Sequence, residues 1–236
     1  MTIIDVIIII CKKWLHIIFE GGKNMRIYNN VFNYDNTSNF VATKKWKRVY
    51  SEHLSDLISE EAIMTPEQKM LYELLGGREA HMKNVMRNYD TDGDFINNYG
   101  VAGMDATGIP ESERHQIIKV SENARQNMYE ETMRHYIQEN GIANGDTTRR
   151  SEVYRDYQLS IKKEDRLKGS WSLQQYETAY TQAFYDAIKE ADPEWELGKP
   201  FDSSILRNLS REDIDNSLVQ SGNRLLLPRK NIDCRV

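Results

Sequence analysis

The stretch "RNYDTDGDFINNYG" collects acidic and amide side chains around a single glycine. An EF-hand register that starts at Asn88 puts Asp90 and Asp92 at its third and fifth positions. Gly93 then falls at the sharp turn of the loop, and Asp94 adds a further carboxylate. Carboxylate and amide oxygens are the ligands that Ca²⁺ prefers. The candidate metal ligands are therefore Asn88, Asp90, Asp92 and Asp94, and calcium is the candidate cofactor.

The last position of this loop argues against calcium. A calcium loop needs a bidentate carboxylate at its twelfth position, and Tyr99 stands there instead. An Asp-Gly pair between aromatic and apolar residues is also a strong signal for a tight turn, and Tyr89 and Phe95 flank this pair. The sequence favours a turn without a cofactor, and calcium binding is the alternative.

Other catalytic or metal-binding patterns are missing from the sequence. The histidines form no HExxH pair or other metal spacing, and no G-x-S-x-G elbow, P-loop or dinucleotide fingerprint is present. His53 falls on the apolar stripe of a predicted helix, and His135 follows Glu131 by one turn. We interpret the paired carboxylates Glu60–Glu61 and Glu130–Glu131 as solvated helix surface. We therefore predict no catalytic residues.

Composition limits the possible partners. The 236 residues are 39% hydrophobic and 28% charged, with a net charge of −5, which predicts a globular protein and argues against nucleic-acid binding. The basic segment "KKWKR" at 44–48 could contact phosphates, but helical spacing places Trp46 on an apolar stripe. The two cysteines, Cys11 and Cys234, form no disulfide framework, which favours a cytoplasmic location. Thirteen tyrosines favour contact with another protein or self-association.

The segment 1–24, "MTIIDVIIIICKKWLHIIFEGGKN", differs from the rest of the chain. Its apolar run lacks the preceding positive charge of a signal peptide and is too short to span a membrane. The codons for "EGGKNM" can include a ribosome-binding site directly before Met25. We therefore favour an over-extended gene start, while an apolar anchor or a packed terminal helix is the alternative. Membrane contact through residues 3–19 would require that they are translated.

The remaining chain predicts helices. Apolar stripes and caps indicate a helix from about Ser38, a helix with a capping box at Thr65 and Gln68, and a helix capped by Ser121. "HQIIKV" at 115–120 is a possible strand, and a short helix is expected around 153–159. Residues 26–40 are expected to form an extended arm.

The most regular pattern is "SLQQYETAYTQAFYDAIKEADPEW". We predict a helix over 172–191 with Ser172 and Gln175 as its capping box, lying at the centre of a single core. A last helix is expected over 210–220. The predicted fold is mainly α, an irregular bundle of about six to seven helices with at most a small β-hairpin or short strand. We expect a leader at 1–24, one helical domain at 25–210, and a C-terminal helix with a basic tail at 211–236.

Two segments carry a family resemblance: "GIPESERHQIIKVSENARQNMYEE" and "LKGSWSLQQYETAYTQAFYDAIKEADPEW". Over roughly residues 25–200 the chain resembles an uncharacterised family of Bacillus-type bacteria. The resemblance implies a spore-forming host but no activity and no site residues. The N-terminal extension and the tail after Gly222 depart from that family.

Two functional hypotheses follow. The first is a non-enzymatic helical interaction or accessory protein that acts through protein–protein contacts. The second is an enzyme or toxin-like effector whose site lies near the glycine-rich loop 93–113, because long loops often carry function. A deep polar pocket in that loop would favour the enzyme, and an aromatic surface would favour partner binding.

We predict that a chain starting at Met25 folds as well as the full chain, since 1–24 is interpreted as a leader. Thermal denaturation of both chains measures this, and we expect equal midpoints. A midpoint several degrees lower for the shorter chain would show that residues 3–19 pack into the core.

Overall fold

The computed structural model describes residues 41–142 and 145–228. The leader, the Met25 start and the extended arm at 26–40 lie outside the described residues. Within the described part of the chain, no helix combines the length and apolar character that crossing a bilayer requires.

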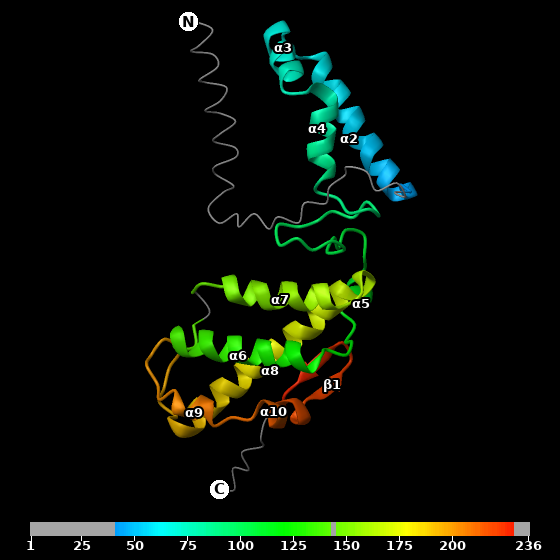
Figure 1. Cartoon of the computed structure of the whole chain (residues 1–236). Helices are drawn as coiled ribbons and strands as arrows, with labels where there is room; N and C mark the ends of the chain where they lie inside the picture. The colour runs from blue at the N-terminus through cyan, green and yellow to red at the C-terminus, as the bar shows by residue number, and fades with distance from the viewer. Residues whose placement is uncertain (1–40, 143–144, 229–236) are drawn as a thin grey trace, which may run out of the picture. The chain divides into compact units, whose positions relative to one another are not determined.

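The first three described helices form a small hydrophobic cluster. They are α2 (Lys44–Ala62), α3 (Pro66–Leu74) and α4 (Gly77–Met86), and α4 runs alongside α2 (Figure 1). Leu57, Met82 and Met86 are its buried residues, and Trp46 and Tyr72 are among the partly buried side chains that pack against them.

Side-chain caps set the starts of α2 and α3. Helix α2 begins at Lys44 rather than near Ser38, because the Thr43 hydroxyl accepts a hydrogen bond from the backbone nitrogen of Trp46. The predicted capping box of Thr65 and Gln68 is present at α3.

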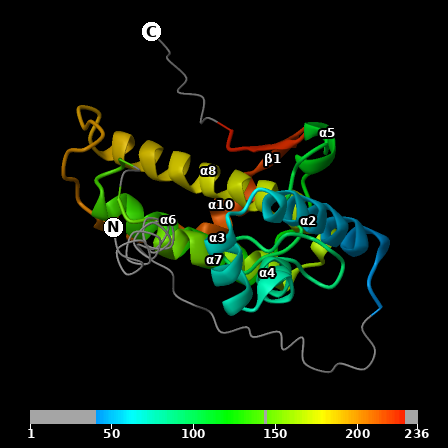
Figure 2. The same ribbon diagram turned by 90° about the horizontal axis from the view of Figure 1, so that it is seen from above.

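A second, larger cluster is built on three helices. They are α6 (Glu122–Gln138), α7 (Thr148–Ser160) and α8 (Arg166–Ala191). Helix α8 runs beside α6 and α7 (Figures 1 and 2). Met128, Leu173, Tyr180, Phe184 and Ile188 are fully buried there.

The central helix is longer than predicted. It begins at Arg166, after the 3₁₀ turn η1 (Lys163–Asp165), so Ser172 lies inside the helix and is not its cap. The hydroxyl of the buried Ser172 instead accepts a hydrogen bond from the backbone nitrogen of Ile118. This contact holds the segment predicted as a strand at 115–120, which has no strand pairing in the structure. The capping-box and strand predictions were wrong because tertiary contacts decide both segments.

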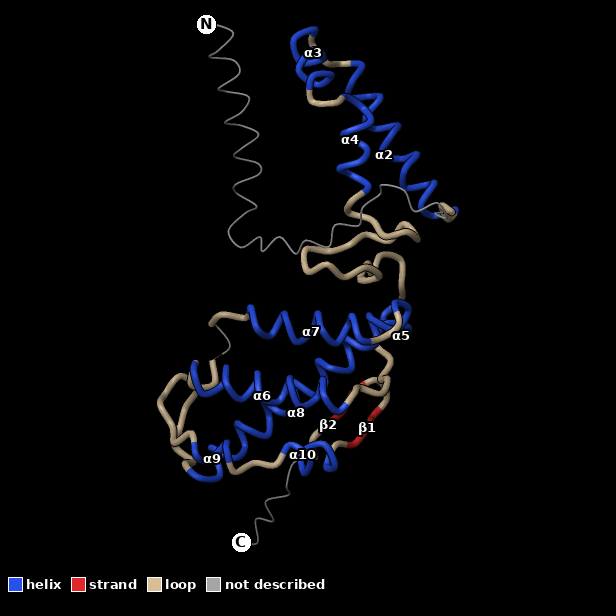
Figure 3. Tube along the Cα trace, viewed as in Figure 1, coloured by secondary structure: helices blue, strands red, loops and turns tan. Residues whose placement is uncertain are grey.

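The C-terminal elements pack onto α8. They are α9 (Ser204–Arg207), α10 (Arg211–Ser217) and a hairpin of β1 (Val219–Ser221) and β2 (Arg224–Leu226), shown in red in Figure 3. Ser210 caps α10 as predicted, but α10 ends at Ser217 because the hairpin begins at Val219. The short helix α5 (Glu111–Arg114) completes the described elements.

An ion-pair network joins α6, α8 and α10. Asp215 accepts hydrogen bonds from Arg125, from Arg211 and from the Tyr180 hydroxyl at 2.8 Å. The Asp215 and Arg211 side chains are almost completely buried, so each charge depends on its partner.

The mainly α prediction with a small hairpin is confirmed. The expectation of a single core is wrong, because the buried hydrophobic residues that cluster do so in two groups, one on α2–α4 and a larger one mainly on α6–α10.

We expect Phe184→Ala to lower the free energy of unfolding by about 3–5 kcal/mol, because Phe184 is fully buried among Tyr129 and Tyr136. The control Gln182→Ala, on the exposed face of α8, should change it by less than about 0.5 kcal/mol. Chemical denaturation measures both, and a nearly neutral Phe184→Ala would contradict the core assignment.

Candidate functional site

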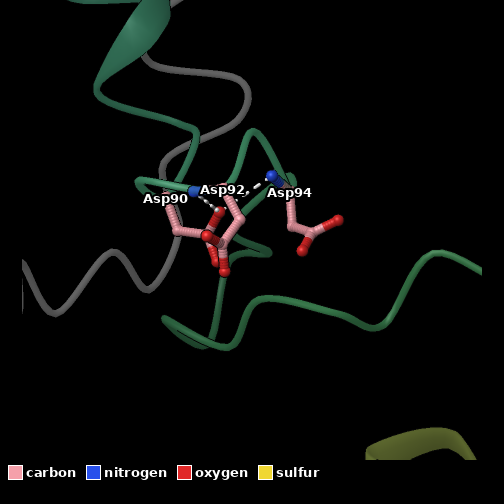
Figure 4. A group of neighbouring side chains, drawn as sticks. All are labelled: Asp90, Asp92 and Asp94. Carbon is pink, nitrogen blue, oxygen red and sulfur yellow. Dashed lines mark hydrogen bonds between the residues drawn. The ribbon is translucent and has the colours of Figure 1, made fainter. Parts of the chain in front are cut away.

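The acidic loop after α4 forms a tight turn. The backbone nitrogens of Asp92 and Asp94 donate hydrogen bonds to one carboxylate oxygen of Asp90, at 3.0 and 2.8 Å (Figure 4). The backbone nitrogen of Gly93 donates to the Asp90 carbonyl, and Tyr89 pairs with Phe95 across the turn. The predicted turn between these two aromatic residues is confirmed.

Gly93 lets this turn contact the start of α2. Its φ is +87°, and a Cβ atom there would lie 2.6 Å from the backbone nitrogen of Trp46. Any side chain would therefore force the loop away from the helix. The Thr43 hydroxyl also donates to the Asp92 carbonyl at 2.7 Å, so the cap of α2 also fixes the loop.

The three aspartates converge, and a lysine lies among them. Oxygens of Asp90, Asp92 and Asp94 lie within 4.8 Å of one another. The Lys163 ammonium group lies 2.9, 2.5 and 2.6 Å from these three carboxylates in turn. The backbone carbonyl of Asn88, the fourth candidate ligand, accepts a hydrogen bond from the backbone nitrogen of Ile96. The arrangement supplies one positive charge where a cation would bind.

The electrostatics of the cluster match this pairing. Burial alone would raise the pKa of Asp94, but hydrogen bonds from Lys163 and Lys45 outweigh it and hold that pKa below its usual value. Burial opposes the charge on Lys163, yet the three aspartates raise the pKa of the ammonium group. Since the pKa of Asp94 is lowered on folding, its contribution to stability is present at neutral pH and lost as the pH falls through its folded-state pKa.

A groove lies at the other end of the same loop. It has a volume of about 380 Å³ and is formed by the loop together with α7 and α8. Its aromatic lining is Tyr99, Tyr154 and Trp171. Its polar lining consists of uncharged side chains and one arginine: Asn97, Ser151, Gln158, Ser170, Gln174 and Arg150. We call this the aromatic groove.

Charge in the aromatic groove is neutralised internally. Arg150 forms a bidentate ion pair with Glu177 of α8, and the Tyr154 hydroxyl donates to Glu177 at 2.7 Å. The Arg150 guanidinium also lies over the Tyr154 ring, 4.9 Å from its centroid. Burial and the Glu177 carboxylate raise the pKa of Tyr154 far above its usual value, so this phenol stays protonated.

Contacts behind the groove fix the Trp171 ring. One face of the ring stacks on His115, with centroids 3.9 Å apart and planes at 13°. Its indole nitrogen donates to the backbone carbonyl of Asn223 at 2.7 Å. Three segments distant in sequence therefore hold this aromatic wall.

Several polar groups of the groove have no partner within the described part of the chain. They are the side-chain nitrogen of Asn97, whose oxygen accepts from the backbone of Tyr99 and Val101, the Ser151 hydroxyl and the Gln174 amide. These groups can donate hydrogen bonds to a ligand.

A different surface of the protein is apolar. Met70 and Leu74 of α3 are 72% and 81% exposed, and Ile63 and Leu75, which precede and follow α3 in the sequence, are 84% and 71% exposed. No residue of α3 is buried. We call these four side chains the α3 apolar face. Grouped exposure of large hydrophobic side chains is typical of an interaction surface.

Of the other interpretations made from single residues, the one for His53 is confirmed and those for Glu131 and Glu61 are wrong. His53 is hydrogen-bonded to the Tyr89 hydroxyl at 2.9 Å, as expected for a histidine at the edge of a core. The prediction that Glu131 is solvated is wrong, because this residue is 1% exposed and accepts two hydrogen bonds from Arg134. Glu61 is likewise paired, and the hydrogen bond from Arg78 lowers its pKa to about 2.

Sequence reasoning found Asn97 and Tyr99 only as part of a loop and missed Lys163, Tyr154, Trp171 and Gln174. The sequence carries no local signal for Lys163, which lies 73 positions after Asp90. The spacing of Met70 and Leu74 by one helical turn was a signal for the α3 apolar face.

The fold and the groove define a mainly helical protein with an aromatic, internally neutralised surface depression. The chain belongs to the family described as Domain of unknown function (DUF3879), whose model matches residues 40–236. No curated protein and no solved structure matches the chain.

We predict that the Asp-Gly loop does not need calcium, because Lys163 already pairs with all three of its carboxylates and Lys45 pairs with Asp94. The thermal midpoint should be the same with Ca²⁺ and with a chelator. Micromolar Ca²⁺ binding in isothermal titration, abolished by Asp92→Ala, would contradict this.

The same pairing predicts that Lys163→Met lowers the free energy of unfolding by about 1–3 kcal/mol, since three carboxylates lose their common donor. The matched control Lys162→Met removes a neighbouring exposed lysine and should have little effect. Urea denaturation of both variants, with and without Ca²⁺, compares them. Equal stabilities would show that Lys163 does not hold the loop.

Proposed function

We propose that this protein is a non-enzymatic interaction protein that binds an extended, proline-rich segment of another protein in the aromatic groove. The observation that carries the proposal is the lining itself. Three aromatic side chains from a loop and two helices surround a depression with unpartnered hydrogen-bond donors and no unpaired charge among its lining residues.

The chemistry of the lining favours this class of ligand. A polyproline II segment has a solvated backbone whose carbonyl oxygens are free, and its proline rings are apolar. Grooves that recognise such segments provide aromatic faces for the rings. Donors beside the aromatic faces, here Asn97 and Gln174, can satisfy the carbonyl oxygens.

The same lining gives less support to the enzyme alternative. General acid–base chemistry needs a group whose proton can move near neutral pH. The lining contains no histidine, cysteine or carboxylate, and its arginine is paired with Glu177. In this proposal the protein acts in the cytoplasm of a spore-forming bacterium, as the cysteine content and the resemblance imply.

A titration with decaproline tests the proposal. We expect its addition to the ¹⁵N-labelled chain to shift the NMR signals of the Trp171 indole and of the Asn97 and Gln174 side-chain amides. Signals of residues outside the groove should stay in place. Tyr99→Ala should weaken binding about tenfold, since an aromatic contact contributes about 1.5 kcal/mol.

The control is Gln182→Ala, which lies on α8 outside the groove and should bind decaproline like the unchanged chain. Maltose serves as a comparison ligand of a different chemical class. If decaproline shifts no signal in the groove, or if maltose shifts those signals instead, the site does not bind proline-rich segments and the proposal is wrong.

A further inference from the structure

The α3 apolar face needs an explanation that the aromatic groove does not give. Helix α3 uses one side to contact its own cluster, where Tyr72 donates to Glu61 at 2.9 Å and lies against the ring of His81. Met70 and Leu74 lie one turn apart and are both largely exposed to solvent. Exposing large hydrophobic side chains together is unfavourable in water unless a partner covers them.

The charges along this face are arranged for self-complementarity. Lys69 and Glu73 are exposed, and neither forms an ion pair within the described residues. They are one helical turn apart and have opposite charges. On a helical wheel both flank the line through Met70 and Leu74 on the same side.

We infer that α3 packs against α3 of a second copy of this chain, antiparallel and around a two-fold axis. Such an axis makes the same surface serve on both copies. When Met70 of one copy lies opposite Leu74 of the other, the axis passes near residue 72. Lys69 then lies about 3 Å along the helix from Glu73 of the second copy, since each residue rises about 1.5 Å.

In the antiparallel arrangement, Lys69 of each copy therefore lies near Glu73 of the other, which gives two pairs of opposite charges. A parallel arrangement would put the charged flanks of the two copies on opposite sides of the contact, so that neither Lys69 nor Glu73 would gain a partner of opposite charge. Ile63 and Leu75 add further exposed apolar area before and after α3. Because α3 is only nine residues long, we expect a reversible dimer rather than an obligate one.

Sedimentation of the full chain across a range of concentrations tests the inference. We expect a monomer–dimer equilibrium with a dissociation constant in the micromolar range. Leu74→Glu places a charge in the apolar contact and should weaken the dimer at least about tenfold. Leu159→Glu changes an exposed leucine outside α3 and should leave the equilibrium unchanged.

A charge exchange tests the antiparallel pairing. Lys69→Glu or Glu73→Lys alone should weaken the dimer, because each puts like charges together. The double exchange should restore it. Circular dichroism confirms that these surface variants fold, so a loss of the dimer is a loss of the contact.

A chain that stays monomeric at every concentration would overturn the inference and assign the face to a different protein. A dimer that Leu74→Glu leaves intact would also overturn it. Decaproline binding is measured separately at the aromatic groove, so either proposal can fail while the other stands.

Discussion

The contact between Lys163 and the acidic loop is the constraint on which the candidate site depends. Lys163 belongs to the η1 turn directly before α8, and its ammonium group lies among three aspartates of the loop after α4. Two neighbouring contacts support it. Arg166 donates to the Ala102 carbonyl at 2.8 Å, and Gly103 approaches the Lys163 side chain so closely that a Cβ atom would lie 2.5 Å from it.

These contacts determine where Asn97 and Tyr99 lie. Both residues belong to the part of the loop between the aspartates and Ala102, so the loop is held at both ends against the start of α8. The opposite wall of the groove depends on how closely α7 approaches α8. Gly169 allows this, because a Cβ atom there would lie 2.5 Å from Ile161 and 3.2 Å from the Tyr157 ring. The Lys163–aspartate cluster and the contact at Gly169 thus determine the shape of the groove, although their residues do not line it.

The sequence was sufficient for most of the helices and for much of their burial. Capping residues act within one turn, so Thr65, Ser121 and Ser210 could be assigned from their neighbours alone. The apolar stripe of α8 also predicted the burial of Tyr180 and Phe184. Ser172 misled because its hydroxyl serves a segment 54 residues away.

The candidate site could not be predicted in the same way. Its aromatic residues come from a loop, α7 and α8, and Lys163 lies 73 positions after Asp90. No local pattern encodes such pairings. Glu131 is a further example, because its burial depends on how α6 packs and not on the charge pattern of its own helix.

The two hydrophobic clusters differ in size, and this difference links stability to association. The α2–α4 cluster has three buried residues, while the cluster on α6–α10 has fourteen. With so little buried apolar area, α2–α4 is expected to open locally at a lower free energy than the larger cluster. A partner that binds only the folded state stabilises it by mass action. Covering the α3 apolar face would therefore stabilise the smaller cluster most. Through the α2 cap and Gly93 it would also steady the acidic loop, because that loop rests on the start of α2.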